Sequence, residues 1–218
     1  MTDKTTTRVG GIGGLLFVIS FIPAYLSAPD SPSAASDLQL LLDYFTSRQS
    51  EILMLNGVLL VFSAFFFLWF VGILHAVLQH AEREGYAFAS VALIGGLLFV
   101  ALMLAGAAVE IVHPATQARF PNYRPDAQLG LVSLALSGWL YRFAFVGMAA
   151  LIAATSLVAI RTGILQKGLA WAGLVIAAVA LLRLLGPLAG WLPLLWIAVV
   201  SVLMVAGMVG RPAVAART

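Results

Sequence analysis

The chain has 218 residues, of which 62% are hydrophobic and only 10% are charged, and its mean hydropathy is +1.03. A soluble domain is closer to half apolar and a quarter charged, so this composition excludes an ordinary water-soluble fold. The net charge of +3 comes without a basic block interleaved with aromatic residues, which argues against nucleic-acid binding, and the absence of cysteine excludes disulfides, thiolate metal sites and thiol nucleophiles.

The apolar residues form long runs, which predict an all-α polytopic membrane bundle with about six transmembrane helices. Each run is near the ~20 residues that cross ~30 Å of hydrocarbon. Helices are expected because backbone groups must pair within the segment in lipid, and no ten-residue alternating strands occur. One bundle accounts for the whole chain, residues 1–218. The predicted spans are Gly10–Ser27, Ile52–Leu78, Ala87–Val112, a segment within Leu136–Ile160, Leu169–Leu185 and Leu192–Val209.

The start of the first span leaves two interpretations open. Lys4 and Arg8 precede an apolar run that ends near residue 27, which is also the pattern of a cleavable signal peptide. Tyr25 and Leu26 are poor replacements for the small residues that a cleavage site needs, so we expect the span to be retained. Cleavage would leave five spans without changing the orientation of the others.

Lysine and arginine residues between the spans predict that the N- and C-termini are both cytoplasmic. With the N-terminus inside, seven basic residues fall in the inner segments and three in the outer ones, and cytoplasmic loops carry the excess of positive charge. The inner residues are Lys4, Arg8, Arg83, Arg161, Lys167, Arg211 and Arg217, and the outer residues are Arg48, Arg119 and Arg124.

Two segments on the predicted outer side are longer than turns. In residues 28–50, Ser36 and Gln39 fit a capping box, and leucines with Phe45 follow at helical spacing, which predicts an amphipathic helix between spans one and two. In residues 113–135, three prolines are expected to prevent a long helix across the first half, while residues 129–136 either extend the fourth span outward or lie on the bilayer. These segments form either a lid over the bundle or simple tethers.

Counting inward from each span end places several polar residues in one layer near the outer boundary. Glu110 and His113 lie on one helical face, with Gly106 below them where a neighbouring helix can approach. Because a charge in hydrocarbon is costly and usually faces a partner, we expect Glu110 to pair with Arg142 or Arg183. The candidate ligand-binding residues are Asn56, Glu110, His113, Tyr141, Arg142 and Arg183.

Two interpretations of this layer stay open. Two arginines against one glutamate would leave a net positive pocket that suits a carboxylate, a phosphate or an anionic headgroup. Alternatively, a glutamate–arginine pair fixes the helix packing, or the arginines extend to the membrane interface. Hydroxyls within the spans, including Ser137, are interpreted as helix-packing groups.

No cofactor or metal site is expected. His75 and His80 are five residues apart and do not share a helical face, and His113 lies at the opposite membrane side. No metalloprotease, hydrolase or nucleotide-binding motif occurs. The glycines of residues 10–14 open the first span without a preceding strand, so they predict close helix packing.

Four short stretches resemble the uncharacterised six-helix integral membrane proteins that are common in bacteria. The resemblance spans most of the chain and implies six helices in the bacterial inner (plasma) membrane. That family has no agreed activity, so the resemblance supplies no functional residues. The stretches are Phe67–Phe70, Tyr141–Phe145, Ala154–Val158 and Gly168–Val175.

Three functional hypotheses remain. The leading one is a non-enzymatic membrane protein that binds or moves a small amphiphile, lipid or anion in an outer-facing polar pocket. The second is a structural or accessory subunit of a larger membrane complex, and the third is an intramembrane enzyme with Glu110 and His113 as acid and base. The expected partners are the lipid bilayer, the ligand, and either a membrane-protein partner or a second copy of the chain.

Overall fold

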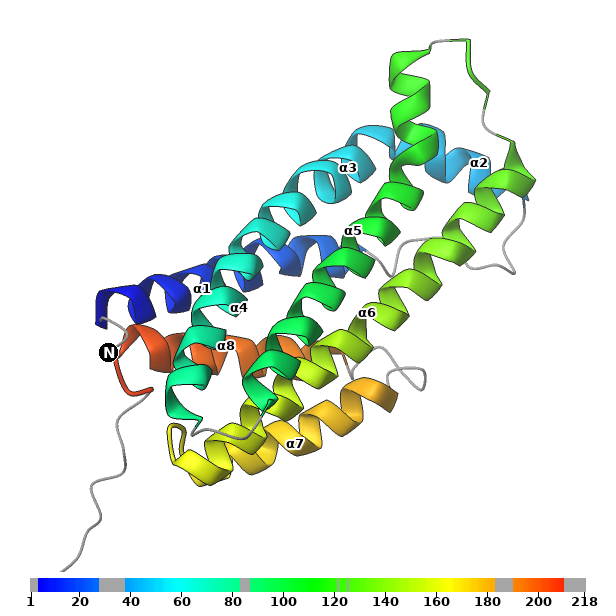
Figure 1. Cartoon of the computed structure of the whole chain (residues 1–218). Coiled ribbons are helices and arrows are strands. Elements are labelled where there is room, and N and C mark those ends of the chain that lie inside the picture. Colours follow the sequence, from blue (N-terminus) through cyan, green and yellow to red (C-terminus); the bar gives the residue numbers. More distant parts are fainter. Residues whose placement is uncertain are drawn as a thin grey trace, which may run out of the picture.

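The computed structural model describes residues 4–27, 38–82, 87–120, 122–124, 126–182 and 190–209. Within these ranges the chain is helical and contains no strand, as the sequence predicts (Figure 1). In chain order the helices are α1 (Lys4–Ser27), α2 (Leu38–Ser47), α3 (Gln49–Met54), the π-helix η2 (Leu55–Leu59), α4 (Leu60–Ala81), α5 (Phe88–Arg119), α6 (Ala127–Thr162), α7 (Lys167–Leu181) and α8 (Trp191–Val205).

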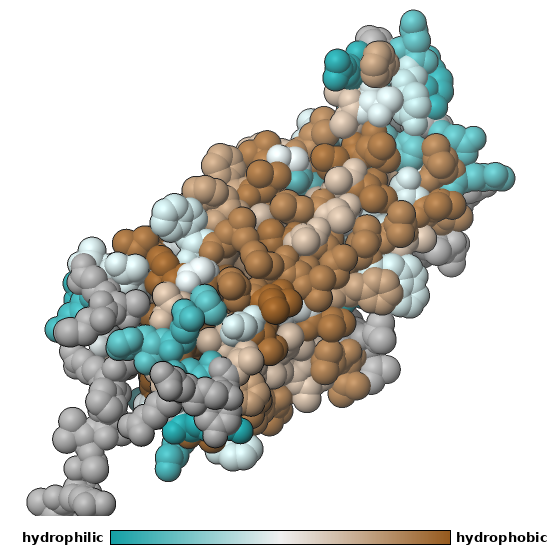
Figure 2. All heavy atoms as spheres, in the orientation of Figure 1, coloured by the Kyte–Doolittle hydropathy of each residue, from teal (hydrophilic) through white to brown (hydrophobic). Residues whose placement is uncertain are grey.

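Four helical segments of the described chain are long and apolar enough to cross a membrane. They are α1 up to Ala24, the continuous run of α3, η2 and α4, and helices α5 and α6. The expected fifth and sixth spans correspond to α7 and α8, apolar helices of 15 residues each. Figure 2 shows a broad apolar band along the flank of the bundle, with polar side chains toward its two ends. This distribution indicates a membrane-embedded protein.

The long helices pack side by side in a closed series, and the contact between α5 and α6 is the most extensive. Helix α1 packs between α4 and α8, α5 packs between α4 and α6, and α7 joins α6 to α8. Four buried phenylalanine rings, one each from α1, α4, α5 and α6, form a continuous row. The ring centroids of Phe17 and Phe67 lie 4.4 Å apart, those of Phe67 and Phe99 5.2 Å, and those of Phe99 and Phe145 6.0 Å. Rings at such separations add to the burial of apolar area.

Glycines allow the closest helix crossings. A Cβ atom at Gly95 of α5 would lie only 2.6 Å from the carbonyl oxygen of Gly147 on α6, so the two backbones touch at this point. On α1, a Cβ atom at Gly11 would meet the backbone of Ser201 on α8, and one at Gly13 would meet the backbone of α4. The predicted packing role of the glycines in residues 10–14 is confirmed.

The C-terminal end of α5 differs from the prediction. The sequence predicts that this helix ends near Val112, but α5 continues through Pro114 to Arg119. Proline removes a single N–H group from the ladder, and the carbonyl oxygen of Pro114 accepts a hydrogen bond from Nε2 of Gln49 at 2.9 Å. The prediction that prolines prevent a long helix here is therefore wrong, because contacts from α3 support the helix beyond the proline.

Helix α6 begins nine residues earlier than the predicted lower limit of the fourth span. Asp126 caps it by accepting hydrogen bonds from the backbone N–H groups of Gln128 at 2.8 Å and Leu129 at 3.0 Å. The apolar stretch at residues 129–136 thus extends the fourth span, which was one of the two alternatives.

Helices α2 and α3 cover one end of the bundle. We call these two helices the cap, and the end that they cover the capped end. The predicted amphipathic helix is present as α2, which contacts both α5 and α6. Its side chains divide as expected, since Phe45 is 1% exposed and Asp43 is fully on the outside. The predicted capping residue Ser36 lies outside the described residues.

We expect Gly95→Ala to lower the stability of the bundle by about 1–3 kcal/mol, because the added methyl group must push α5 away from Gly147. The matched control is Gly72→Ala on α4, where a Cβ atom meets nothing within 4 Å. Unfolding in mixed micelles should show a loss of stability in the first variant and none in the second. Equal stabilities would show that the α5–α6 crossing is not tight.

Candidate functional site

A buried carboxylate lies between α5 and α6 near the capped end. Glu110 of α5 is 9% exposed. The hydroxyl of Tyr141 donates to its Oε2 atom at 3.1 Å, the hydroxyl of Ser137 donates to Oε2 at 3.4 Å, and the hydroxyl of Tyr44 donates to Oε1 at 3.4 Å. The side-chain amide of Asn56 also reaches the carboxylate. Glu110 thus gathers polar groups from α2, η2 and α6.

Helical spacing explains how α6 presents two hydroxyls to one carboxylate. Ser137 and Tyr141 are four residues apart and therefore lie on one face of α6. Gly106, one turn before Glu110 on α5, leaves room for the Tyr141 ring, because a Cβ atom there would lie 3.0 Å from the ring. The predicted role of Gly106 in close helix approach is confirmed by this contact.

Asn56 reaches the site from an irregular turn. It belongs to the π-helix η2, Leu55–Leu59, which interrupts the α-helical run between α3 and α4. A π-turn inserts one residue into the turn and leaves backbone groups without their usual partners, and such turns occur frequently at functional sites. This local distortion coincides with the level at which Glu110 lies.

His113 forms a second group one turn further along α5. The imidazole is 2% exposed, with Nδ1 2.7 Å from the Tyr123 hydroxyl and Nε2 3.3 Å from Oγ of Ser133. Ser133 donates its own hydrogen to the carbonyl oxygen of Leu129 at 3.0 Å, so its oxygen accepts from Nε2–H. These contacts fit a neutral imidazole with its hydrogen on Nε2 and with Nδ1 accepting from Tyr123.

The two groups form one polar seam along the α5–α6 contact. We use this name for Glu110 and His113 of α5 together with Ser133, Ser137 and Tyr141 of α6. The three residues of α6 follow at intervals of four, and the two of α5 are three apart, so the seam consists of neighbouring turns of two packed helices.

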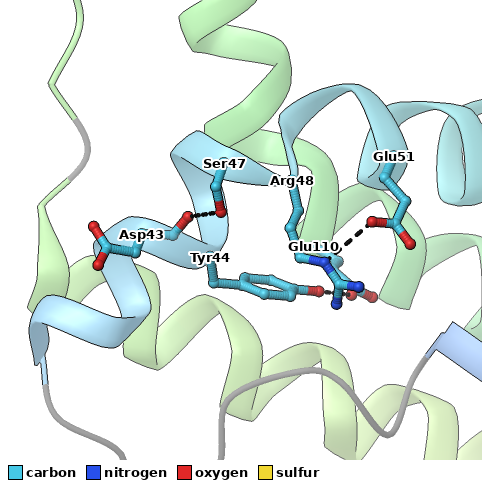
Figure 3. A network of polar contacts seen from close by, with 6 residues as sticks. All are labelled: Asp43, Tyr44, Ser47, Arg48, Glu51 and Glu110. Carbon is cyan, nitrogen blue, oxygen red and sulfur yellow. Dashed lines mark hydrogen bonds and ion pairs between the residues drawn. The ribbon is translucent and has the colours of Figure 1, made fainter.

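The cap is attached to the seam at defined points (Figure 3). The Tyr44 side chain points from α2 toward Glu110, and Arg48 forms an ion pair with Glu51 at 3.1 Å. Gln49 adds the hydrogen bond to the Pro114 carbonyl oxygen. The attachment also has an apolar part, because the buried Phe45 and Ile52 of the cap pack with Ile111 of α5 and Leu131 of α6.

Arg142 does not join the candidate site. Its side chain is exposed, and its guanidinium carbon lies 4.9 Å from the Trp139 ring centroid on the outside of α6. The expected Glu110–Arg142 pair is therefore not formed, because Tyr141 faces α5 and the next residue along a helix points about 100° away. Arg183 lies outside the described residues.

The level of the seam matches one boundary of a bilayer. Arg161 lies over the Phe88 ring, 4.8 Å from its centroid, which puts the far ends of α5 and α6 at one level. Glu110 follows Phe88 by 22 residues and Arg142 precedes Arg161 by 19, which at 1.5 Å per residue places them about 33 Å and about 29 Å from that level. A hydrocarbon layer of ~30 Å bounded at Arg161 has its other boundary near both residues.

Sequence reasoning brought together three of the residues that meet here: Asn56, Glu110 and Tyr141. It placed His113 one turn away on the same helix face. Ser137 was assigned to helix packing, and its hydroxyl instead contacts the carboxylate. The regular spacing of polar residues on α6 could have indicated the seam. The other partners that the sequence analysis missed are Tyr44, Tyr123 and Ser133.

Histidines elsewhere have structural contacts. Nδ1 of His75 lies 3.0 Å from the carbonyl oxygen of Ala89, which links α4 to the first turn of α5. Among the described residues, no group of three or more His, Cys, Asp or Glu side chains could hold a metal ion.

The arrangement can hold a positive charge or a proton. Every hydrogen bond that the described residues donate to Glu110 comes from a neutral group, and the distances of 3.1–3.4 Å exceed the roughly 2.5–2.7 Å of a strong hydroxyl–carboxylate bond. These donors carry no formal charge, so an ionised Glu110 is not neutralised by them and can attract a cation or a proton. Compared with known proteins, the chain matches no protein-family model, no curated protein and no solved structure.

We expect Tyr44→Phe to loosen the cap without disturbing the bundle. Losing one hydrogen bond of about 1 kcal/mol should speed amide hydrogen exchange in α2 by roughly fivefold, because α2 opens locally. Asp43→Asn changes an exposed side chain of the same helix and should leave the exchange rates unchanged. Equal exchange in Tyr44→Phe and the unmodified chain would show that this contact does not hold the cap.

Proposed function

We propose that the chain is a multi-pass protein of the bacterial inner (plasma) membrane with six spans and cytoplasmic termini. The charge bias of the connecting segments supports this orientation, which places the capped end outside. Helices α7 and α8 are about 22 Å long at 1.5 Å per residue, and the bilayer accommodates short spans by thinning locally.

The orientation is testable because the natural chain lacks cysteine. Asn122→Cys lies beyond the capped end and Gln166→Cys lies between α6 and α7, both at exposed positions. On intact cells, a membrane-impermeant maleimide should label the first variant, and should label the second only after permeabilisation. The reverse pattern would place the capped end in the cytoplasm.

We propose further that the seam binds the headgroup of a small amphiphile at the outer membrane boundary. The observation that carries this proposal is the burial of Glu110 among neutral donors. Ionisable residues within membrane helices are costly, and they are retained mainly for function. The level of Glu110 supports an amphiphile, since a ligand held there keeps its headgroup on the carboxylate and its tail in the hydrocarbon.

The geometry favours a cationic headgroup within the broader class of lipids, amphiphiles and anions. Glu110 carries a negative charge, and Arg142, which would have attracted an anion, faces the outside of α6. An ammonium group would complement the carboxylate and could also lie against the Tyr44 and Tyr141 rings, because aromatic faces attract cations.

A structural role is the second candidate. The hydrogen bonds of Glu110 tie α2 and α6 to α5, so the carboxylate could serve only to hold the cap in place. A ligand site and a structural tie differ in one respect: only the first exchanges partners when a cationic amphiphile is present.

Native mass spectrometry with a permanent cation tests the ligand site. Dodecyltrimethylammonium added to the full chain in a non-ionic detergent should be retained as one adduct, and Glu110→Gln should abolish it. Glu51→Gln is the matched control, because it removes the same charge from an exposed position in the cap. Retention of dodecyl phosphate instead, or equal retention by Glu110→Gln, would contradict the proposal.

A further inference from the structure

We propose that the seam delivers protons from the outer solution to Glu110 through Tyr123, His113, Ser133 and Ser137. This inference deepens the proposed function, on which its physiological role rests: arrival of a proton would release a cationic ligand from the carboxylate. The proton path itself stands on hydrogen-bond geometry and can be tested without any ligand.

The outer half of the path is a chain of three directed contacts. Tyr123 is partly exposed beyond the end of α5, and its hydroxyl lies 2.7 Å from Nδ1 of His113, with the two rings stacked. On the other side of the imidazole, Nε2 donates to Ser133 at 3.3 Å. An imidazole that accepts on one nitrogen and donates on the other can pass a proton between its two sides.

The inner half of the path runs along one face of α6. Ser133 and Ser137 lie one helical turn apart, with roughly 5–6 Å between their Cβ atoms. The Ser137 hydroxyl already donates to Glu110 at 3.4 Å. The Ser133 hydroxyl donates to the Leu129 carbonyl oxygen, so it must rotate toward Ser137 before a proton can pass. The two serine hydroxyls share no hydrogen bond in the described part of the chain, so this rotation must also bring the Ser133 oxygen within hydrogen-bond distance of Ser137.

The transfer conserves protons at every group. Tyr123 takes a proton from the outer solution and gives its own to Nδ1 of His113, while Nε2 gives its proton to Ser133. Ser133 passes its proton to Ser137, and Ser137 passes its own to the Glu110 carboxylate. The sum is one proton moved from solution to Glu110, with His113 left as the tautomer that carries hydrogen on Nδ1. Reorientation of the imidazole and of the hydroxyls resets the path.

Titratable and charged side chains from several helices lie near the path. The phenols of Tyr44 on α2 and Tyr141 on α6 face Glu110, and Asp126 at the start of α6 lies near enough to His113 to act on it electrostatically. The ion pair of Arg48 and Glu51 lies in the cap.

The consequence for the ligand follows from competition for one carboxylate. A cation and a proton cannot both neutralise Glu110, so a proton that arrives through His113 weakens the binding of a cationic headgroup. Binding from the outer side would then be favoured at low proton concentration, and release would be favoured at high proton concentration.

Time-resolved infrared spectroscopy after an acid jump tests the path in the full chain embedded in lipid nanodiscs. Protonation of Glu110 produces a carboxylic acid C=O stretching band, which is assigned by its absence in Glu110→Gln. We expect His113→Gln to slow the appearance of this band by about tenfold or more, because the amide can keep both hydrogen bonds but cannot relay a proton.

Two further variants make the result independent of folding defects. Tyr123→Phe keeps the stacked ring and removes the outer hydroxyl, so it should also slow the band. Asp43→Asn removes an exposed carboxylate of α2 that lies outside the path, so it should leave the rate unchanged. Equal rates in all variants, or no Glu110 band at any pH at which the protein is folded, would overturn the proton path. If the unmodified chain did not bind dodecyltrimethylammonium, this result would overturn the proposed ligand site but not the proton path.

Discussion

The capped end of this protein depends on one buried carboxylate. Glu110 accepts hydrogen bonds from hydroxyl groups of α2 and α6 and lies next to Asn56 of η2. Elements that are far apart in the sequence therefore meet at a single side chain. Burying such a group is unfavourable unless its oxygen atoms are hydrogen-bonded, and this requirement fixes how those elements turn toward α5. Gly106 makes the arrangement sterically possible, because it leaves space for the Tyr141 ring.

The remainder of the bundle is held by apolar packing, and the two kinds of interaction occupy different levels. The packed phenylalanines and the Gly95–Gly147 crossing lie further along α5 and α6 from the cap, whereas the polar seam lies beside the cap. Arg142 marks the level of the seam from the outside of α6, where it rests on Trp139. The cap is joined to α5 and α6 at this level by the Tyr44 hydrogen bond and by the packing of Phe45 and Ile52.

Periodicity and charge were sufficient to predict the helices and the level of the polar residues, because both follow from distance along a helix. The direction in which each side chain points around the helix axis was harder to predict from the sequence. Tyr141 and Arg142 are neighbours at one depth, yet one faces Glu110 and the other faces outward, and only the packing of α6 decides which. The contact from Tyr44 depends on how α2 docks, and the passage of α5 through Pro114 depends on support from Gln49, so neither could be predicted from local sequence.

A double-mutant cycle between Glu110 and Tyr141 measures the central interaction most directly. Reversible unfolding of the unmodified chain, Glu110→Gln, Tyr141→Phe and the double variant gives their coupling free energy. A carboxylate that organises the capped end predicts a favourable coupling of about 1 kcal/mol, in the range of hydrogen bonds within membrane proteins. Additive effects, with no coupling, would contradict the account and would mean that α5 and α6 meet at this level through apolar packing alone.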